Sequence, residues 1–399
     1  MISRDHYINQ LVDFKDKQII KVVTGVRRCG KSTLFLLYQN YLKSIGVNEK
    51  QIISINLEDL DYEYLLDYKE LYKYIKSRIL ENSNTYVFID EIQNCESFEK
   101  VVDSLFIKDG VDVYITGSNA YMLSGELATY LSGRYVKIDM LPLSFKEFYL
   151  AGSENFENSR QCFNSYIRQG AFPYIVSNII NTSSIDIYLD GIYNTVLMKD
   201  VVQRNDVKDV LLLKQIIKTL ASSIGSPISS NKIRNTIVSN GRKVSVNTIE
   251  NYIKALCDGY IFYKVDRFDV KGRQNLKTLG KYYIVDMGIR NLIVTSKSGD
   301  LGHVIENIVY LELIRRGYKV NIGKVGDAEV DFIATGMNKT VYIQVSATVL
   351  HEKTLNRELK SLKDIDDNHE KILLTLDEIG SNSNHNGIIQ KNLLEWLVE

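Results

Sequence analysis

The nine residues GVRRCGKST (25–33) constrain the fold of this chain more than any other stretch. They follow the apolar run IIKVV and precede KSTLFLLYQNYLKSIG, which has the pattern of a helix. A G-x-x-x-x-G-K-[ST] pattern placed between a buried strand and a helix is typical of a phosphate-binding loop. The stretch therefore predicts an α/β fold built on a parallel sheet, and a chance match to the pattern is the weaker interpretation.

In such a loop, backbone N–H groups surround a phosphate, and glycines allow the close approach that a Cβ would block. Lys31 is expected to reach the β- and γ-phosphates, and the Ser32 hydroxyl to ligate Mg²⁺. The predicted cofactors are thus ATP and Mg²⁺. The residues expected to bind them are Gly25, Val26, Arg27, Arg28, Cys29, Gly30, Lys31, Ser32 and Thr33.

Two acids end a second apolar run, YVFIDE (86–91). A buried parallel strand would deliver Asp90 and Glu91 at its carboxyl end, where ligands bind in open α/β sheets. Asp90 is expected to hold Mg²⁺ through water, and Glu91 to orient or deprotonate the water that attacks the γ-phosphate. Two solvated acids at the end of a strand are the alternative, which the phosphate-loop pattern disfavours.

Polar or basic side chains flank two further expected strands. VDVYITGSN (111–119) ends in Ser118 and Asn119, and Asn119 or Ser118 is the candidate for a polar sensor of the γ-phosphate. Arg134 precedes another strand, and an arginine near the transferring phosphoryl group stabilises the charge that develops there. Arg134 could act in its own subunit or on a neighbour, and a structural ion pair explains it equally well.

Five strands are expected in this part of the chain, separated mostly by helices. This order predicts a parallel sheet covered on both faces. A strand inserted between the loop strand and the acid strand would carry the sensor. The expected strands are 18–24, 51–57, 86–91, 111–117 and 135–140.

Composition narrows the remaining possibilities. The 399 residues predict two to four domains. A net charge of zero argues against a protein that binds polyanions over its whole surface. The four scattered cysteines fit free thiols in a reducing compartment. Because the sequence shows neither a secretory signal nor a run of 18 apolar residues, we expect a cytoplasmic protein that does not enter a membrane.

Six stretches together resemble the AAA-type ATPases of bacteria and archaea that carry a C-terminal domain of uncharacterised function. They are GVRRCGKST, YVFIDEIQN, TGSNAYML, LSGRY, QGAFP and KDVVQRND. The resemblance covers nearly the whole chain and implies ATP binding, ATPase activity and an unsettled biological role. It also implies that Arg204, in the KD-x-x-x-R segment, is a second candidate for an arginine finger or a lid residue.

Helical patterns dominate the middle of the chain. Residues 146–206 are expected to form a helical lid over the nucleotide, with a plain helical linker as the alternative. Residues 207–285 contain three helical patterns followed by an alternating strand, as in a winged helix-turn-helix. Basic residues near its turn and wing suggest DNA contacts, although such modules also serve only as packing units.

The order helix, three strands, helix, strand over residues 286–399 resembles restriction-endonuclease-like folds. By this resemblance Asp331 is a metal carboxylate, Gln344 holds the second position, and Glu306 adds a carboxylate from a helix. The lysine expected two residues after Gln344 is Ser346, which supplies neither charge nor a useful pKa for metal-assisted cleavage. We therefore expect a degenerate nuclease module, unless a lysine elsewhere, such as Lys339, substitutes.

Three functions follow from these patterns. The leading one is a Mg-dependent ATPase whose core (1–145) controls the C-terminal half and acts on or with DNA, with a homo-oligomer as a further expectation. The second is a slow switch ATPase that controls a protein partner. The third is an ATP-dependent nuclease, which requires compensation for Ser346.

Overall fold

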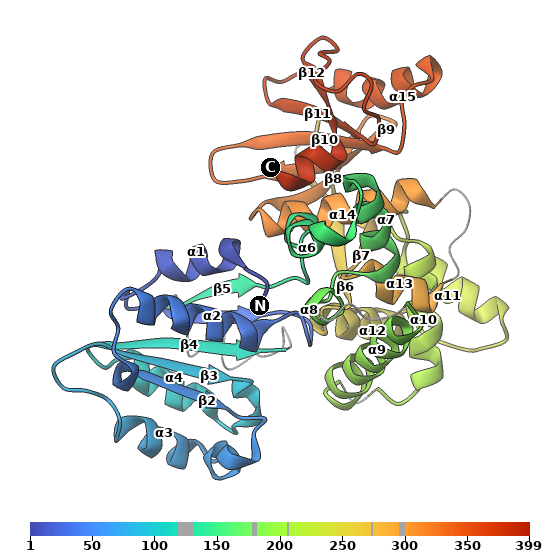
Figure 1. Ribbon diagram of the computed structural model, residues 1–399. Helices are drawn as coiled ribbons and strands as arrows, with labels where there is room; N and C mark the ends of the chain where they lie inside the picture. The colour runs from blue at the N-terminus through green and yellow to red at the C-terminus, as the bar shows by residue number, and fades with distance from the viewer. Residues whose placement is uncertain (119–130, 132, 178–181, 206, 273, 295–299) are drawn as a thin grey trace. The chain divides into compact units, whose positions relative to one another are not determined.

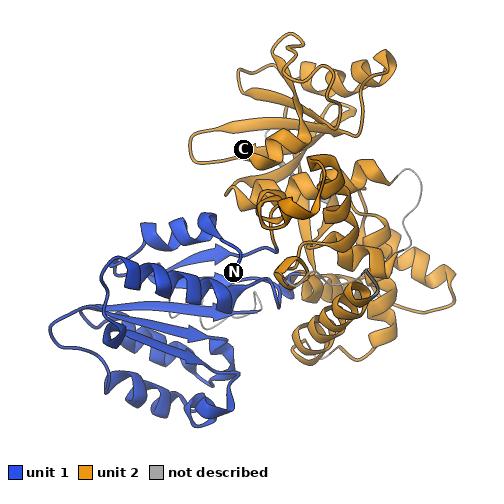
Figure 2. Cartoon of the chain, in the orientation of Figure 1, with its two compact units in different colours: residues 1–142, 258–260 blue, residues 143–257, 261–399 orange. Residues whose placement is uncertain are grey.

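The structure is a computed structural model that divides into two compact units (Figure 2). One unit holds residues 1–142 and 258–260, and the other holds residues 143–257 and 261–399. Among the described residues, no helix is both long and apolar enough to span a bilayer. The described residues are 1–118, 131, 133–177, 182–205, 207–272, 274–294 and 300–399.

The first unit contains a five-stranded, all-parallel sheet in the order β2-β3-β4-β1-β5 (Figure 1). This confirms the parallel sheet and places β4 between the loop strand β1 and the acid strand β3, as expected. The strands are β1 (Ile20–Thr24), β2 (Ile52–Asn56), β3 (Thr85–Asp90), β4 (Val111–Gly117) and β5 (Tyr135–Asp139).

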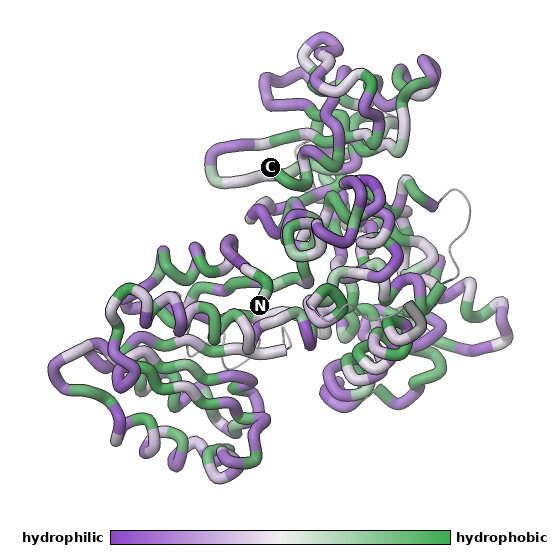
Figure 3. Tube along the Cα trace, viewed as in Figure 1, coloured by the Kyte–Doolittle hydropathy of each residue, from purple (hydrophilic) through white to green (hydrophobic). Residues whose placement is uncertain are grey.

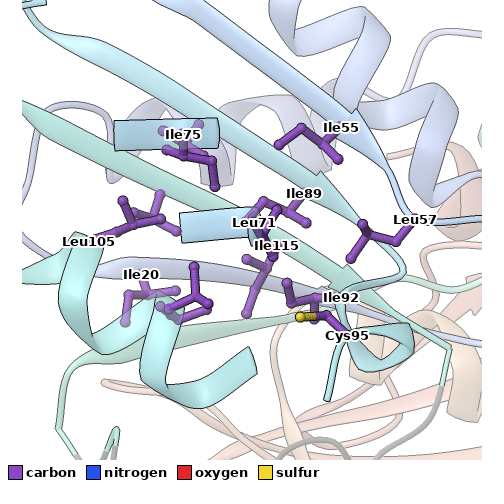
Figure 4. Close-up of a cluster of buried hydrophobic side chains, with 14 of the residues drawn as sticks. Ile20, Ile55, Leu57, Leu71, Ile75, Ile89, Ile92, Cys95, Leu105 and Ile115 are labelled. Atoms are coloured by element: carbon purple, nitrogen blue, oxygen red, sulfur yellow. The ribbon is translucent and has the colours of Figure 1, made fainter. Parts of the chain in front are cut away.

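Alternation along the strands sends apolar side chains to both faces of this sheet. Phe88 and Tyr114 stack on each other with ring centroids 4.6 Å apart, and Phe35 of α2 packs edge-on against Phe88. Ile89 and Ile115 belong to the cluster on the other face, which includes side chains of α3 and α4 (Figure 4). The helices are α1 (Asp5–Asp13), α2 (Lys31–Ser44), α3 (Tyr68–Lys76) and α4 (Phe98–Phe106).

Burial explains why these strands read as apolar runs in the sequence. Every residue of β1 and β3 is buried, and the trace along the central strands is largely hydrophobic (Figure 3). Parallel strands covered on both faces need apolar side chains on both faces, so they lack the polar alternation of a half-exposed strand.

The second unit begins with the helices expected after residue 144. The side chain of Ser144 accepts the N–H of Glu147, and the Glu147 carboxylate accepts the N–H of Ser144, which caps the first helix. A π-helical segment, Val196–Gln203, follows the last of these helices. The helices are α6 (Phe145–Gly152), α7 (Ser159–Gln169), α8 (Pro173–Ser177) and α9 (Thr182–Thr195).

Three helices and a hairpin then follow in the order that the sequence predicts. The helices are α10 (Val210–Ser222), α11 (Ser230–Ser239) and α12 (Val246–Asp258). The hairpin strands are β6 (Phe262–Asp269) and β7 (Gln274–Ile284), followed by α13 (Met287–Ile293).

The hairpin belongs to a seven-stranded mixed sheet in the order β12-β11-β10-β9-β8-β6-β7. Because β6 pairs with β8, this sheet continues across the border expected after residue 285. The division into four domains stays a prediction. The remaining elements are α14 (Leu301–Arg315), β8 (Lys319–Val325), β9 (Ala328–Thr335), β10 (Thr340–Ser346), α15 (Glu352–Lys363), β11 (Glu370–Thr375), β12 (Ile388–Asn392) and α16 (Leu393–Val398).

One buried carboxylate fixes the QGAFP stretch. Asp286 accepts the N–H of Ala171 at 2.6 Å and the N–H of Ile289 at 3.0 Å, so it caps α13 and holds the end of α7. Gly170 has φ +79° and lies so close to this carboxylate that a Cβ would collide with it. Burial raises the pKa of Asp286 to about 6, and the backbone N–H groups oppose that rise.

Candidate active site

The phosphate-binding pattern occupies the turn between β1 and α2, at the carboxyl edge of the first sheet. Gly25 has φ +153°, and a Cβ there would overlap the carbonyl oxygen of Met140. Gly30 has φ +108° and precedes the first residue of α2. Glycine is therefore required at both positions, and the N–H groups at the start of α2 form an anion site.

Lys31 is buried at this edge, with 5% of its surface exposed. Its Nζ donates to the carbonyl oxygen of Gly25 at 3.1 Å and lies 3.5 Å from Oε1 of Glu91. The lysine thus has one neutral acceptor and one longer ion pair, and both partners can be exchanged for phosphate oxygens.

The side chain of Thr116, on β4, connects the two acids that end β3. Its hydroxyl donates to Oδ1 of Asp90 and accepts the N–H of Glu91 at 2.9 Å. Burial raises the pKa of Asp90, and hydrogen bonds from Ser32 and Thr116 oppose that rise without cancelling it. The effect of Ser32 on the pKa of Asp90 means that the two groups that the sequence assigns to Mg²⁺ are near each other.

Glu91 sits in a left-handed backbone conformation, with φ +51° and ψ +50°. Burial alone would raise the pKa of its carboxyl, but Lys31, Gln93 and Arg27 outweigh it and hold this pKa below its usual range. Ser118 also hydrogen-bonds to Glu91. The carboxylate is therefore ionised at neutral pH, as a water-orienting residue requires.

The other loop residues differ in their exposure. Val26 and Cys29 are buried, and burial raises the pKa of the Cys29 thiol. Arg28 is exposed, with φ +66°, and Thr33 is half-buried. Arg27 pairs with Glu58, just beyond β2, at 2.9 Å.

Arg134 is not among the residues brought together here. Arg134 precedes β5 at the amino edge of the sheet, opposite the loop, where it pairs with Asp103 of α4. Arg204 belongs to the second unit and lies 3.5 Å from the buried carboxylate of Asp200. Asn119 lies outside the described residues.

Sequence reasoning missed Thr116 and Arg4 in this unit. Arg4 is buried, and its guanidinium donates to the carbonyl oxygens of Cys29 at 3.1 Å and Leu141 at 2.6 Å. It therefore holds the backbone of the phosphate loop from outside. A threonine within an apolar strand was a visible signal for Thr116, whereas nothing near Arg4 resembles a motif.

The residues present fit a nucleotide with Mg²⁺. Loop N–H groups and Lys31 suit the phosphates, and the side chains of Ser32 and Asp90 offer the oxygen ligands that Mg²⁺ prefers. Thr116 holds Asp90 in place from the side of the sheet.

A second polar cluster lies in the second unit and includes the three residues expected there. Glu306 of α14 and Asp331 of β9 both lie near Nζ of Lys281, a β7 residue that sequence reasoning missed. Asp331 donates its N–H to Oε1 of Gln344 at 3.2 Å. Lys339 lies elsewhere, in an exposed pair with Glu370.

Burial governs the acids of this cluster. It raises the pKa of Asp331 to about 7, with Glu306 adding to the rise and Lys281 opposing it. Burial would also raise the pKa of Glu306, but Lys281, His303 and Tyr283 reverse that effect, so the pKa is lowered.

The sheet order and the site together define a phosphate-loop ATPase of the AAA type. The family described as an AAA domain matches residues 17–149, and a domain of unknown function (DUF8612) matches residues 160–299.

The chain belongs to one family with two uncharacterised proteins. An uncharacterised protein of Haemophilus influenzae is 38% identical over 402 residues, covering 100% of this chain and 99% of that protein. An uncharacterised protein of Methanocaldococcus jannaschii is 33% identical over 365 residues, covering 86% of this chain and 77% of that protein.

Two solved structures are similar over most of the chain. The Walker-type ATPase PABY2304 of Pyrococcus abyssi has 12% identity and a TM-score of 0.49, with 73% of this chain and 96% of that chain covered. The Aeropyrum pernix Orc1 protein in complex with DNA has 10% identity and a TM-score of 0.31, with 73% and 92% covered.

Proposed function

We propose that this chain is a Mg-dependent ATPase whose nucleotide state controls its second unit, and that it acts in the cytoplasm on or with DNA. One observation carries the ATPase proposal. A buried lysine, held 3.5 Å from Glu91, lies with Asp90 and the start of α2 at the carboxyl edge of a parallel sheet.

The chemistry begins with a change of partners at Lys31. Phosphate oxygens are better acceptors for the Lys31 ammonium than the Gly25 carbonyl. A hydrogen bond between two charged groups is stronger than one to a neutral acceptor. When Lys31 turns to the phosphates, the Glu91 carboxylate loses its ion pair and is free to accept a proton from water. Binding of the correct ligand therefore prepares the base.

The backbone at Glu91 keeps that base in position. The Thr116 hydroxyl fixes the Glu91 N–H, and the 3₁₀ turn that follows holds the left-handed residue in place. Ser32 and Asp90 would hold Mg²⁺, which supplies charge neutralisation at the phosphates. Positioning and electrostatic stabilisation account for most of phosphoryl-transfer catalysis, so these contacts have direct consequences for rate.

Three arginines are candidates for stabilising the charge on the transferring phosphoryl group. Arg134 pairs with Asp103 at the far edge of its own sheet, so its proposed role is on a neighbouring subunit of a homo-oligomer. Arg204 is the second candidate, from the segment after the π-helix. Arg27 is in the loop itself, and its pair with Glu58, whose carboxylate is 47% exposed, can exchange for phosphate.

DNA is the proposed partner of the three helices and hairpin of residues 207–285. Two of the ion pairs there lie near the surface, Arg242 with Asp209 at 3.2 Å and Lys264 with Asp266 at 2.8 Å. Exposed pairs of this kind contribute only about 0–1 kcal/mol. They can therefore be given up for DNA phosphates, where released counterions favour binding.

The same ion pairs favour a second candidate function. Where acids of the chain itself neutralise these basic side chains, the surface carries little net positive charge. Such a surface suits a switch ATPase that presents its second unit to a protein. In that case nucleotide turnover would be slow and insensitive to DNA. An ATP-dependent nuclease is the third candidate and depends on the second polar cluster.

The ATPase rate with and without duplex and single-stranded DNA tests both main candidates. The DNA proposal expects a several-fold rise in rate, and a DNA affinity whose logarithm falls linearly with log salt. The control is Glu91→Gln, in which DNA cannot raise turnover. A rate that DNA leaves unchanged, together with a flat salt dependence, would favour the protein-partner function. Absence of any nucleotide binding would remove the ATPase proposal itself.

A further inference from the structure

Lys281 has an unusual position for a lysine. It lies on β7, 2% exposed, and its Nζ is surrounded by carboxylates. The distances from Nζ are 2.8 Å to Oε1 of Glu306, 2.9 Å to Oε1 of Glu329 and 3.7 Å to Oδ1 of Asp331. A buried ammonium requires such partners, because taking an ion out of water costs several kcal/mol even after the protein relaxes.

The carboxylates come from two elements and are themselves held in place. Tyr283, on the same strand as Lys281, donates its hydroxyl to Oε1 of Glu306 at 2.7 Å. Asp331 accepts the N–H of Val345 at 2.9 Å through Oδ2. Lys281 therefore joins the hairpin strand β7 to α14 and β9 at the centre of a fixed arrangement.

A divalent metal does not fit this arrangement, although the nuclease resemblance implies one. Gln344, in the second ligand position, donates to Glu358 at 2.8 Å and accepts the N–H of Asp331, so both ends of its amide are engaged. Within the described ranges, no group of three His, Cys, Asp or Glu side chains is arranged to hold a metal ion. The Lys281 ammonium occupies the space among the three carboxyl groups.

We propose that Lys281 is the resident cation of the C-terminal module: its ammonium neutralises the carboxylates that would otherwise bind a divalent metal, and the module binds no such metal. The lysine absent at position 346 is thus replaced in space by Lys281, but as a counter-ion and not as a residue for cleavage. This inference goes beyond the proposed ATPase function and does not depend on it.

The cluster is open to solvent, so a lack of access would not keep a metal ion out of it. A cavity of about 510 Å³ reaches the cluster at Glu329 and Gln344, so small ions in water can enter. Four acidic and three basic side chains line it, a balance that favours small cations over the phosphates of DNA. Exclusion of metal therefore has to come from the ammonium itself.

Removing the ammonium should turn the cluster into a metal site. In Lys281→Met, Glu306, Glu329 and Asp331 would repel one another with no cation between them, and a divalent ion would relieve that repulsion. The matched control is Lys339→Met, which removes an exposed lysine from the same module. Because nucleotide would bring metal to the first unit, the experiment uses the full-length chain without nucleotide.

The probe is Mn²⁺, followed by calorimetric titration and by thermal unfolding. We expect no saturable binding in wild type or in Lys339→Met, and in Lys281→Met a new site with a Tm that rises by several degrees as Mn²⁺ is added. Saturable Mn²⁺ binding to wild type that Asp331→Asn abolishes would overturn the proposal. So would a folded Lys281→Met that binds no Mn²⁺.

Wild type alone decides the matter if Lys281→Met does not fold. Its Mn²⁺ titration either shows the Asp331-dependent site, which overturns the proposal, or shows none, which supports it. Plasmid cleavage by wild type with Mn²⁺, lost in Asp331→Asn, would equally contradict it. Nucleotide binding, measured separately, reports on the ATPase proposal, so failure of one is distinguishable from failure of the other.

Discussion

Lys31 in the first unit and Lys281 in the second are both buried lysines that face carboxylates, but their surroundings differ. Lys31 has one carbonyl at 3.1 Å and one carboxylate at 3.5 Å. Lys281 has two carboxylates within 2.9 Å and a third at 3.7 Å. The first lysine has contacts to gain from an incoming anion, whereas the second already has three carboxyl groups around it.

The difference separates a binding lysine from a structural one. A ligand changes a site only when it offers better interactions than those it replaces. For Lys31 phosphate offers that improvement. For Lys281 any exchange would leave several acids buried without a counter-ion, which is strongly unfavourable. Contact geometry thus predicts function where residue type alone does not.

The largest effect should come from the base that Lys31 restrains. In Glu91→Gln, proton acceptance is lost, so kcat should fall by about 10²–10⁴-fold while ATP still binds. Turnover and equilibrium nucleotide binding measured on the same preparation separate the two effects. Unchanged hydrolysis would remove Glu91 from the mechanism and with it the proposed exchange of partners at Lys31.

Replacing each lysine by methionine tests the comparison directly. Lys281→Met should lower the free energy of unfolding by about 3–5 kcal/mol, because it breaks a buried ion network. Lys31→Met should lower it by less, about 1–3 kcal/mol, because one hydrogen bond and one longer ion pair are lost, and it should abolish stabilisation by ATP. Denaturant titrations with and without nucleotide measure both. Equal losses of stability would show that the two lysines do not differ as proposed.

The two sites should also respond to pH with opposite sign. The pKa of Asp331 is raised to about 7, so its contribution to stability is complete below its unfolded value of 3.8 and is lost as pH rises through 7. The pKa of Glu91 is lowered, so its contribution is present above 4.5 and is lost as pH falls.

Free energies of unfolding between pH 4 and 8 check this. Relative to Asp331→Asn, wild type should become less stable with rising pH, and relative to Glu91→Gln it should become more stable from acid to neutral pH. Asp286, whose pKa is also raised, has the same sign as Asp331 and cancels in the comparison with Asp331→Asn. A pH-independent difference for Asp331→Asn would mean that its proton is not shared with the cluster.

How far the sequence predicted these sites depends on how local their determinants are. The strands and the loop were predictable because burial on both faces demands apolar runs, and because the positive φ angles of Gly25 and Gly30 favour glycine in this turn. The acids of β3 follow from strand polarity alone. Their geometry adds the hydrogen bonds of Thr116, which no spacing rule provides.

The cluster around Lys281 was not predictable in the same way. Lys281 and Asp331 are 50 residues apart, on strands separated in the sheet by others, and a single lysine in an alternating strand usually faces solvent. Asp331 and Gln344, which the resemblance assigns to one site, are hydrogen-bonded to each other. Only three-dimensional packing reveals which cation balances them, because the missing lysine was replaced from a different strand.

The smallest effect is expected from Thr116, whose hydroxyl contacts both acids of the proposed nucleotide site. Thr116→Val removes the hydroxyl that donates to Asp90 and accepts from Glu91, at nearly constant volume. Leaving such buried groups unsatisfied costs about 1–3 kcal/mol, so kcat should fall by roughly tenfold or more. Thr116→Ser keeps the hydroxyl and should restore most of the rate. If valine and serine gave the same turnover, the hydroxyl would not position the acids, and β4 would contribute packing alone to this site.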